Sequence, residues 1–408
     1  MKVLWFTSSP VLGYSDNVSG SWTYSMYNAL SRLEGIDIIN IVISHGLNQG
    51  PALGNTVIIE SNTKNRQRPG RELIELFREV VSKIKPDLIH IWGTEWNGSY
   101  ITVMANLGIP VLVSIQGITA SVRKHLSGNR KTIEILRWLT IHDLIAPSGL
   151  MSIYRDLKRT STMEFKAIEQ LHYFECATPF MEAWVRSVNN KAEVFQCNSI
   201  LRPVFYKFRW SESSMQNHSL FLPDAFMSYK GFDVMLKSAE ILIKEFPYLQ
   251  IRVAGVVPRK GFFEASGYER FMHSIIKKKN LESKIVFLGP LKSDRLCHEM
   301  LSSHCVVISS FIESQSLILL ESMMLGVPTI ASYAGGMPDL FTNMQTALGY
   351  PAGDHISLAH RVRSLFNNQN LANQISSNAY NLAHKRNEQL SCAEGMANIY
   401  RTVLHKIN

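Results

Sequence analysis

The sequence has few cysteines and no long hydrophobic run. No run approaches the roughly 18 to 20 consecutive apolar residues that a membrane-spanning helix needs. The N-terminus turns polar at Thr7 and lacks a cleavage site, so residues 2–6 are predicted to form a buried strand, not a signal peptide. An odd, scattered cysteine set without CxxC or zinc-ligand spacing fits a reducing cytosol, and argues against disulfides and a structural metal. These cysteines are Cys176, Cys197, Cys297, Cys305 and Cys392.

Acidic residues are outnumbered. The chain has 42 Lys and Arg against 33 Asp and Glu, a net charge of +9, which suggests an anionic partner. Ordinary solvent-exposed faces account for the basic clusters. The alternative is that the clusters bind an anionic lipid surface, to which each basic residue adds attraction. Nucleic acid is not expected, because no recognition motif or aromatic platform accompanies the charge. The clusters are Lys64, Arg66, Arg68 and Arg71; Arg123, Lys124, Arg130, Lys131 and Arg137; and 277–279.

The 408 residues are more than one hydrophobic core usually serves, so two domains are expected. Short β-branched runs alternate with helical patterns, which indicates parallel sheets wrapped by helices. We predict strands at 2–6, 36–43, 88–92 and 111–115, and again at 218–222, 249–254, 285–288, 306–309 and 329–331. The predicted domains are 1–200 and 201–386. A final helix at about 387–408 could pack back on the first domain.

Doubly wound sheets bind ligands at the carboxyl ends of their strands, so the strand-to-helix loops should carry the chemistry. One such loop is the turn around Gly20, between the first strand and a helical run. A turn of this kind puts free backbone N–H groups at a helix N-terminus, where an anion can bind. A plain turn explains this glycine about as well.

The segment 306–340 is the most informative. A strand runs into a loop with Glu313, Ser316 is a good N-cap, and 317–325 has helical periodicity. Glu321 would lie roughly 7 to 8 Å along that helix, at 1.5 Å rise per residue. Two carboxylates so placed can hold groups about a sugar diphosphate apart. The free N–H groups of Leu317 and Ile318 suit a phosphate.

This segment resembles the Glu-x7-Glu signature of retaining glycosyltransferases of family 4, which have the GT-B fold of two facing Rossmann-like α/β domains. The resemblance continues through 326–332 and 335–339, which look like the typical GxPxxAS and GGxPE continuation. Further points of likeness are Lys230-Gly231 before a helix, Ala254-Gly255 after a strand, and 287–289. The loops 90–96 and 114–117 look like first-domain cleft loops of the family.

The resemblance implies that the domain 1–200 is on the acceptor side and that the domain 201–386 binds the nucleotide-sugar donor. It also implies a role for each matched residue. The first glutamate, Glu313, would contact the donor hexose, and Glu321 the ribose hydroxyls. Lys230 matches a lysine that contacts the donor diphosphate, and Gly255 would lie on the donor side. Glu95 and Gln116 would lie on the acceptor side.

The implied activity is hexosyl transfer with retention from a UDP- or GDP-sugar to an acceptor. The acceptor is expected to be a saccharide, in particular a lipid-linked saccharide of bacterial surface polysaccharide synthesis. No cofactor is expected, and no divalent metal, because Asp16, Asp87 and Asp143 are isolated and form no Asp-x-Asp pair. The expected location is the cytoplasm, with peripheral binding at the inner face of the membrane.

Three departures from the family keep alternatives open. Ala225 stands where the family commonly has an arginine, with Arg259 or Lys260 as substitutes, and Ser316 stands where it has a glycine. Gln116 replaces a cleft histidine and cannot act as a general base. The alternatives are a non-catalytic nucleotide-sugar-binding subunit of the same fold, and a nucleotide-sugar 2-epimerase.

Overall fold

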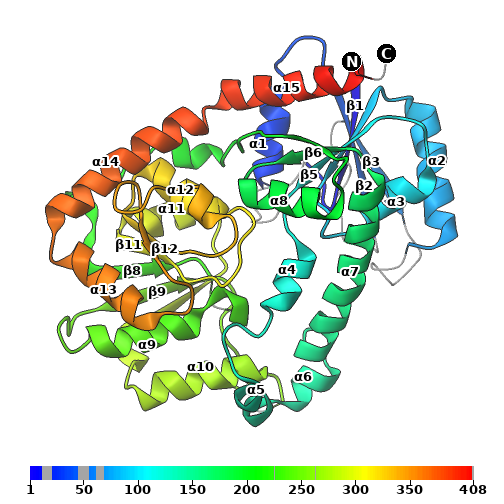
Figure 1. The fold of residues 1–408 in the computed structure, drawn as a ribbon. Helices are drawn as coiled ribbons and strands as arrows, with labels where there is room; N and C mark the ends of the chain where they lie inside the picture. Colours follow the sequence, from blue (N-terminus) through cyan, green and yellow to red (C-terminus); the bar gives the residue numbers. More distant parts are fainter. Residues whose placement is uncertain (12–20, 45–54, 61–68, 225, 262, 407–408) are drawn as a thin grey trace. The chain divides into compact units, whose positions relative to one another are not determined.

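The computed structural model describes residues 1–11, 21–44, 55–60, 69–224, 226–261 and 263–406. The chain divides into two compact units (Figure 1). Unit 1 comprises Met1–Ala120, Asp156–Arg202 and Asn387–Asn408, and unit 2 comprises Ser121–Arg155 and Pro203–Arg386. Each unit is built around a parallel β-sheet flanked by helices, so the predicted fold class of two Rossmann-like α/β domains is confirmed.

Unit 1 contains a seven-stranded sheet in the order β3-β2-β1-β4-β5-β6-β7. Apolar clusters cover both faces of this sheet, as expected for parallel strands, which are buried on both sides. The strands are β1 (Lys2–Thr7), β2 (Asp37–Ser44), β3 (Thr56–Glu60), β4 (Leu88–Trp92), β5 (Val111–Ile115), β6 (Tyr173–Cys176) and β7 (Glu193–Phe195). The helices are α1 (Ser21–Leu30), α2 (Arg71–Ile84), α3 (Gly98–Ala105), α8 (Pro179–Val188) and α15 (Gln389–His405).

The C-terminal helix α15 belongs to unit 1. It lies beside α1 and completes the apolar cluster on one face of the sheet, with Met396 and Tyr400 buried there (Figure 1). The Trp5 indole N–H donates to the Tyr400 hydroxyl over 3.0 Å, which satisfies a polar group that would otherwise be costly to bury. The last helix of the chain is thus part of the core of the first domain.

Unit 2 contains a six-stranded sheet in the order β10-β9-β8-β11-β12-β13. Its strands are β8 (Gln216–Leu222), β9 (Gln250–Ala254), β10 (Ile285–Gly289), β11 (Ser303–Ile308), β12 (Thr329–Ser332) and β13 (Leu348–Tyr350). The helices around the sheet are α9 (Phe232–Leu242), α10 (Gly267–Lys278), α11 (Ser293–Leu301), α12 (Leu317–Leu325), α13 (His355–Phe366) and α14 (Gln369–Arg386). Strand β11 lies between β8 and β12, which brings their following loops together.

A segment from the first half of the sequence, Ser121–Arg155, groups with unit 2; we call it the arm. It carries the end of α4 (Thr119–Lys124), then α5 (Thr132–Trp138), α6 (Ile141–Ile145) and the start of α7 (Leu150–Gln170). The Gly267 N–H donates to Asp143 over 2.7 Å, and the Ser228 hydroxyl donates to the Leu126 carbonyl. Because of these contacts, residues 121–155 group with unit 2, whereas the sequence analysis assigns all of residues 1–200 to the first domain.

Candidate functional site

Two loops meet at the carboxyl edge of the sheet of unit 2, after the neighbouring strands β8 and β11. The Phe311 N–H donates to the Tyr229 carbonyl over 2.7 Å, and the Ser309 hydroxyl donates to the Lys230 carbonyl over 2.9 Å. Between them lies Gly231 with φ of +70°; a Cβ there would stand 2.1 Å from the Ser309 carbonyl oxygen. Only glycine combines that backbone conformation with so close an approach, so the Lys230-Gly231 pair holds the lysine against the loop that follows β11.

The two loops are also joined by an ion pair between Lys230 and Glu313. The Lys230 Nζ donates to Glu313 Oε1 over 2.7 Å, and the Ser310 hydroxyl donates to the same oxygen over 2.7 Å. The side chains are 25% and 16% exposed, so the pair is held within the protein but reachable from solvent. Burial acts to lower the pKa of Lys230, but the Glu313 charge outweighs it and raises that pKa above its ordinary value. The ammonium is therefore fully charged at neutral pH.

A pair of glycines contacts the loop that carries Glu313. The Gly336 N–H donates to the Glu313 carbonyl over 2.8 Å. Gly335 has φ of +55°, and a Cβ there would stand 2.0 Å from the same carbonyl oxygen. The Gly335-Gly336 pair of the sequence pattern thus has a structural reason. Because Gly335 has no side chain, the backbone turn can contact the Glu313 carbonyl directly and fix the position of the Glu313 loop.

The helix α12 begins at the same edge of the sheet, and its bounds, Leu317–Leu325, are the predicted ones. The Ser316 hydroxyl accepts a hydrogen bond from the Leu319 N–H, so Ser316 is the N-cap that the sequence predicts. Leu317 and Ile318 lie in the first turn and are half-buried. The first N–H groups of a helix have no partner within it, so this turn offers donors and a partial positive charge.

Glu321 lies farther along α12 among buried residues and is 2% exposed. Its neighbours on the helix between Leu319 and Leu325 are apolar except for Ser322. The structure therefore places the two signature glutamates differently: Glu313 is on a solvent-reachable loop, and Glu321 is inside a buried helix. The contact of Glu321 with a ribose stays a prediction.

Gly255 lies at the same edge, after β9, with φ of +91°. Its N–H donates to the Gly289 carbonyl over 3.0 Å. A Cβ at this position would stand 3.1 Å from Oδ1 of Asp224, a residue that the sequence analysis did not assign to the site. That carboxylate accepts the Phe226 N–H over 2.9 Å and so shapes the loop after β8. The missed signal is an aspartate directly beyond a predicted strand.

The sequence analysis also missed Ser310 and Tyr229, which flank the ion pair. Ser310 donates to Glu313, and the Lys230 ammonium lies 5.5 Å from the centre of the Tyr229 ring. By contrast, Arg259, considered as a substitute for a missing arginine, donates from Nε to Glu269 over 3.1 Å and lies against α10. Two residues of interest, Gly20 and Ala225, fall outside the described residues, as do Lys64, Arg66 and Arg68 of the first basic cluster.

The acceptor-side candidates lie at the carboxyl edge of the sheet of unit 1. Gln116 follows β5 and is half-buried, and Glu95 follows β4. The Glu95 carboxyl folds against Gly93, where a Cβ would stand 2.5 Å from its Oε2. The surrounding protein, and then the Glu164 charge, raise the pKa of Glu95 to about 7, against backbone hydrogen bonds that lower it. Because the Glu95 residue is itself exposed, water screens these interactions and we expect a smaller shift in solution.

No group of three or more His, Cys, Asp or Glu residues in the described ranges is placed to hold a metal ion. All five cysteines are buried and unbridged. Among the helices of the described residues, none has both the length and the apolar character needed to cross a bilayer.

Residues 207–382, less than half of the chain, match the family model "Glycosyl transferases group 1". This part of unit 2 is therefore a glycosyl transferases group 1 domain. The chain is 26% identical to N-acetyl-alpha-D-glucosaminyl L-malate synthase of Bacillus anthracis over 130 residues, 32% of this chain and 34% of that protein. It is 31% identical to D-inositol 3-phosphate glycosyltransferase of Rhodococcus jostii (strain RHA1) over 121 residues, 29% of this chain and 26% of that protein. The matches thus span about a third of one relative and about a quarter of the other.

Solved structures resemble the whole chain. Sucrose-phosphate synthase from Thermosynechococcus elongatus has a TM-score of 0.77 at 15% identity, covering 100% of both chains. Anabaena Alr3699/HepE, solved in complex with UDP and glucose, has a TM-score of 0.71 at 14% identity, covering 98% of this chain and 100% of that one. At such identities the likeness shows the fold alone. That fold is the one of the GT-B glycosyltransferases.

Proposed function

We propose that this protein is a glycosyltransferase that moves a hexosyl group from a UDP- or GDP-sugar to a saccharide acceptor. The observation that carries the proposal is the Lys230–Glu313 pair, 2.7 Å apart, at the edge where α12 begins. It combines a permanently charged cation, a carboxylate and a helix N-terminus, which are the groups that a sugar diphosphate requires. The group 1 domain at 207–382 contains all of them.

In the proposed reaction, the bond between the anomeric carbon and the diphosphate oxygen breaks, and a bond from that carbon to the acceptor oxygen forms. The Lys230 ammonium and the first N–H groups of α12 stabilise the charge that develops on the departing diphosphate. Such preorganised groups typically supply the largest single catalytic contribution. Glu313 holds the hexose through its hydroxyls, and Glu321 holds the ribose.

We further propose that the acceptor proton passes to the leaving diphosphate. Gln116, at the edge of unit 1, has no titratable group that could take it. Transfer on the face of the leaving group gives retention and requires no metal. We propose a lipid-linked saccharide as the acceptor, met at the inner face of the cytoplasmic membrane, because the chain carries a net charge of +9.

The test is to incubate the protein with UDP-glucose, UDP-N-acetylglucosamine, UDP-galactose and GDP-mannose, with and without EDTA, and to measure release of the nucleoside diphosphate. We expect release of the nucleoside diphosphate from one of the donors, and we expect EDTA to leave that release unchanged. Donor binding without release would favour a non-catalytic subunit instead, and a sugar inverted at C2 would favour an epimerase. If the protein bound none of the four donors, the proposal would be overturned.

A substitution of Lys230 sharpens this test. Lys230→Ala is expected to lower kcat/KM by about 100-fold or more, because one preorganised charge contributes roughly 3 kcal/mol to the transition state. Lys237→Ala is the matched control: Lys237 pairs with Asp233 on α9 in the same unit, 41% exposed. Equal losses in the two variants would show that the effect of Lys230 is not local to the site.

A further inference from the structure

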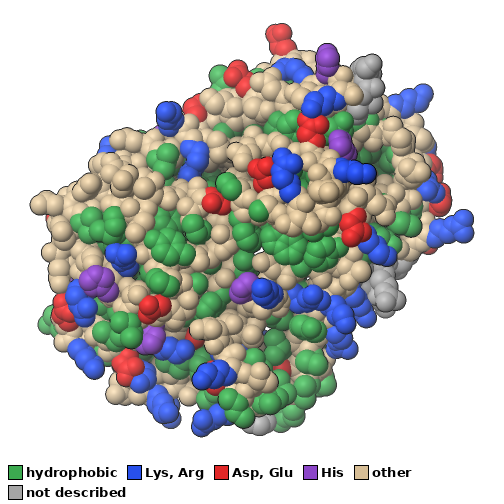
Figure 2. All heavy atoms as spheres, in the orientation of Figure 1, with side chains coloured by type: hydrophobic (Ala, Val, Ile, Leu, Met, Phe, Trp, Pro, Cys, Tyr) green, Lys and Arg blue, Asp and Glu red, His purple; other side chains and the backbone are tan. Residues whose placement is uncertain are grey.

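The arm exposes large apolar side chains on its outer surface. Ile133 and Leu136 on α5 are 70% and 60% exposed, and Ile145 on α6 is 77% exposed. Ile141 and Leu144, also on α6, are about half exposed. Hydrophobic side chains gather where α5 and α6 lie at the lower end of the view in Figure 2. A patch of neighbouring exposed apolar residues on a soluble surface marks a place of interaction.

These side chains are not needed to attach the arm to unit 2. Its inner surface does that: Ile135 and Leu139 line a small cavity together with Tyr268 of α10. The Arg130 guanidinium lies 5.0 Å from the centre of the Tyr268 ring, and Asp143 accepts the Gly267 N–H. The inner surface of the arm therefore already packs against unit 2, whereas its second apolar surface faces water.

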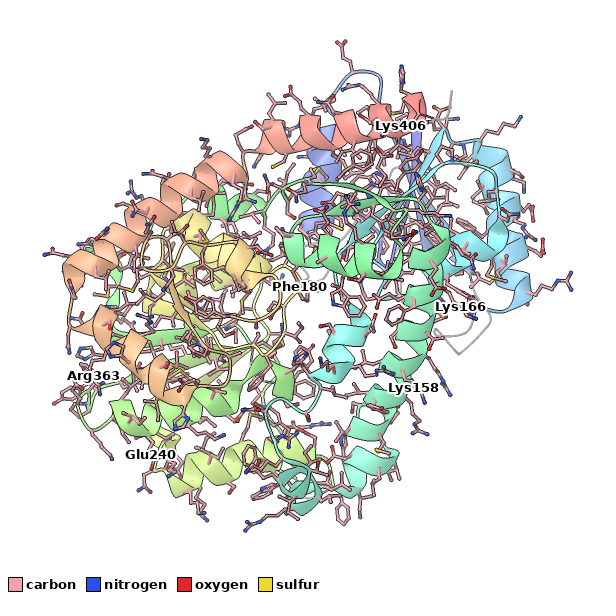
Figure 3. All side chains as sticks on the ribbon, in the orientation of Figure 1. Lys158, Lys166, Phe180, Glu240, Arg363 and Lys406 are labelled. Carbon is pink, nitrogen blue, oxygen red and sulfur yellow. The ribbon has the colours of Figure 1, made fainter. Side chains whose placement is uncertain are left out.

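The charged residues around the apolar patch are mostly of one sign. Lys124, Lys131, Arg137 and Arg155 are exposed on the arm, whereas Glu134 is its exposed acid and Asp143 is 3% exposed. Lys158 continues the basic series along α7 (Figure 3). Apolar side chains flanked by lysine and arginine match the boundary of an anionic bilayer, in which acyl chains lie beneath negatively charged headgroups.

We propose that the arm docks the protein on an anionic lipid bilayer. The apolar side chains of α5 and α6 enter the boundary between headgroups and acyl chains, and the flanking lysines and arginines contact the headgroups. A second copy of the chain fits this surface poorly, because it would bring the same positive charge against it. The proposed function places the acceptor at a membrane without saying which surface binds it; this proposal assigns the arm to that role and does not depend on sugar transfer, since lipid binding needs no sugar donor.

The arm is joined to the donor site. The Ser228 hydroxyl donates to the Leu126 carbonyl of the arm, and Ser228 begins the short helical turn Ser228–Lys230 that carries the site lysine. A Cβ at Gly128 of the arm would stand 2.8 Å from the Ser228 carbonyl oxygen, so the two backbones touch. A bilayer bound to the arm would therefore be held close to the loop of Lys230.

Co-sedimentation with vesicles tests the proposal. The full chain is expected to bind vesicles of phosphatidylcholine mixed with phosphatidylglycerol, and to bind pure phosphatidylcholine vesicles weakly. The double variant Ile133→Ser and Ile145→Ser should lose affinity about tenfold, because two apolar side chains no longer leave water. The matched control is Ile356→Ser on α13, where the isoleucine is 64% exposed; this variant should bind like the wild type.

Charge variants give a second measurement. Lys131→Gln with Arg137→Gln is expected to weaken binding about 25-fold, at roughly fivefold for each basic residue near an anionic surface. High salt should weaken vesicle binding by the wild type, and should weaken binding by this variant less. Circular dichroism and the thermal midpoint should be unchanged in every variant, since the substituted residues are exposed.

Three outcomes would overturn the proposal. The first is that the wild type binds neither kind of vesicle. The second is that Ile356→Ser weakens binding as much as the substitutions on the arm. The third is a dimer in sedimentation that the arm variants dissociate, which would assign the patch to a second copy. Failure of sugar transfer with intact vesicle binding would overturn the proposed function alone.

Discussion

The two units hold their buried carboxylates in different ways. In unit 2, the Glu269 side chain is 0% exposed and lies 3.0 Å from the Arg259 guanidinium. The Glu299 side chain is also 0% exposed and lies between Arg252 and Arg295, 2.7 Å from the latter. Burial acts to raise the pKa of Glu269, but hydrogen bonds from Arg259 and from backbone N–H groups outweigh it and lower that pKa. Glu269 is therefore ionised at neutral pH.

In unit 1, neutral donors hold the corresponding groups. Glu164 accepts the Thr94 hydroxyl over 2.8 Å and the Thr119 N–H over 3.3 Å. Glu175, on β6, is held by the Ser114 hydroxyl and a backbone N–H. Burial raises the pKa of both carboxyls, that of Glu175 to about 7. Neutral donors thus compensate for lost hydration less completely than a guanidinium does.

The comparison shows that burial alone does not decide the charge of a carboxyl; the partner does. Units built on sheets of the same class hold an ionised Glu269 in one unit, and in the other hold carboxyls that keep their protons to higher pH. Unit 2 is also the unit with the Lys230–Glu313 pair. Three Glu→Gln substitutions test the comparison.

The largest effect is expected for Glu269→Gln. Since the folded-state pKa lies below the ordinary value of 4.5, the ionised group contributes stability above that pH and loses it as pH falls through the folded pKa. At pH 7 the variant should lose about 3 kcal/mol of unfolding free energy, the low end of the cost of breaking a buried pair. Urea denaturation with hydrogen exchange in α10 measures this. If the difference in unfolding free energy between the variant and the wild type did not shrink at acidic pH, the assigned charge of Glu269 would be contradicted.

Glu175→Gln should have the opposite sign. Its folded-state pKa of about 7 lies above the ordinary value of 4.5, so the wild type is expected to lose stability as pH rises between these values. The variant avoids that loss and should be more stable at pH 8 by about 2 to 3 kcal/mol, with no gain at pH 4. Urea denaturation with hydrogen exchange in β6 is the measurement. A destabilised variant at pH 8 would mean that Glu175 is ionised and well solvated.

The smallest effect is expected for Glu240→Gln in unit 2. Glu240 (Figure 3) pairs with Lys279 over 2.5 Å, but the two side chains are 37% and 34% exposed. Water and salt screen such a pair, so the loss should be under about 1 kcal/mol. The same denaturation experiment serves as the control for the other two variants. A loss as large as that of Glu269→Gln would show that burial is not the variable that matters.

Much of the fold could be predicted because it depends on local patterns. The strands at 88–92 and 111–115 have the predicted bounds, and α12 begins and ends at the predicted residues. Strong apolar runs bounded by proline, an N-cap serine and a C-terminal glycine are enough for that. Strands β3, β6, β7 and β13 were not predicted. Each has three to five residues, and none is preceded within two residues by a proline of the kind that marks the starts of 88–92 and 111–115.

The candidate site could be predicted only in part. Glu313, Ser316 and the first turn of α12 follow from one continuous segment, and the structure confirms their positions on a loop, an N-cap and a helix. The ion pair could not be predicted in this way, because Lys230 and Glu313 are 83 residues apart. The order of strands brings them together: β11 lies beside β8, so their loops share an edge. Strand order depends on packing between helices and sheet, which no local period records.

The sequence by itself therefore determined the alternation of strands and helices, the extent of α12 and the position of Glu313 at the carboxyl edge of a strand. The tertiary structure decided that Lys230 faces Glu313, that α15 completes the core of unit 1, and that the arm belongs with unit 2. It also decided which buried carboxyls find a cation. The physical reason is range: periodicity and capping act within a few residues, whereas ion pairs and apolar contacts join residues that only the folded chain brings together.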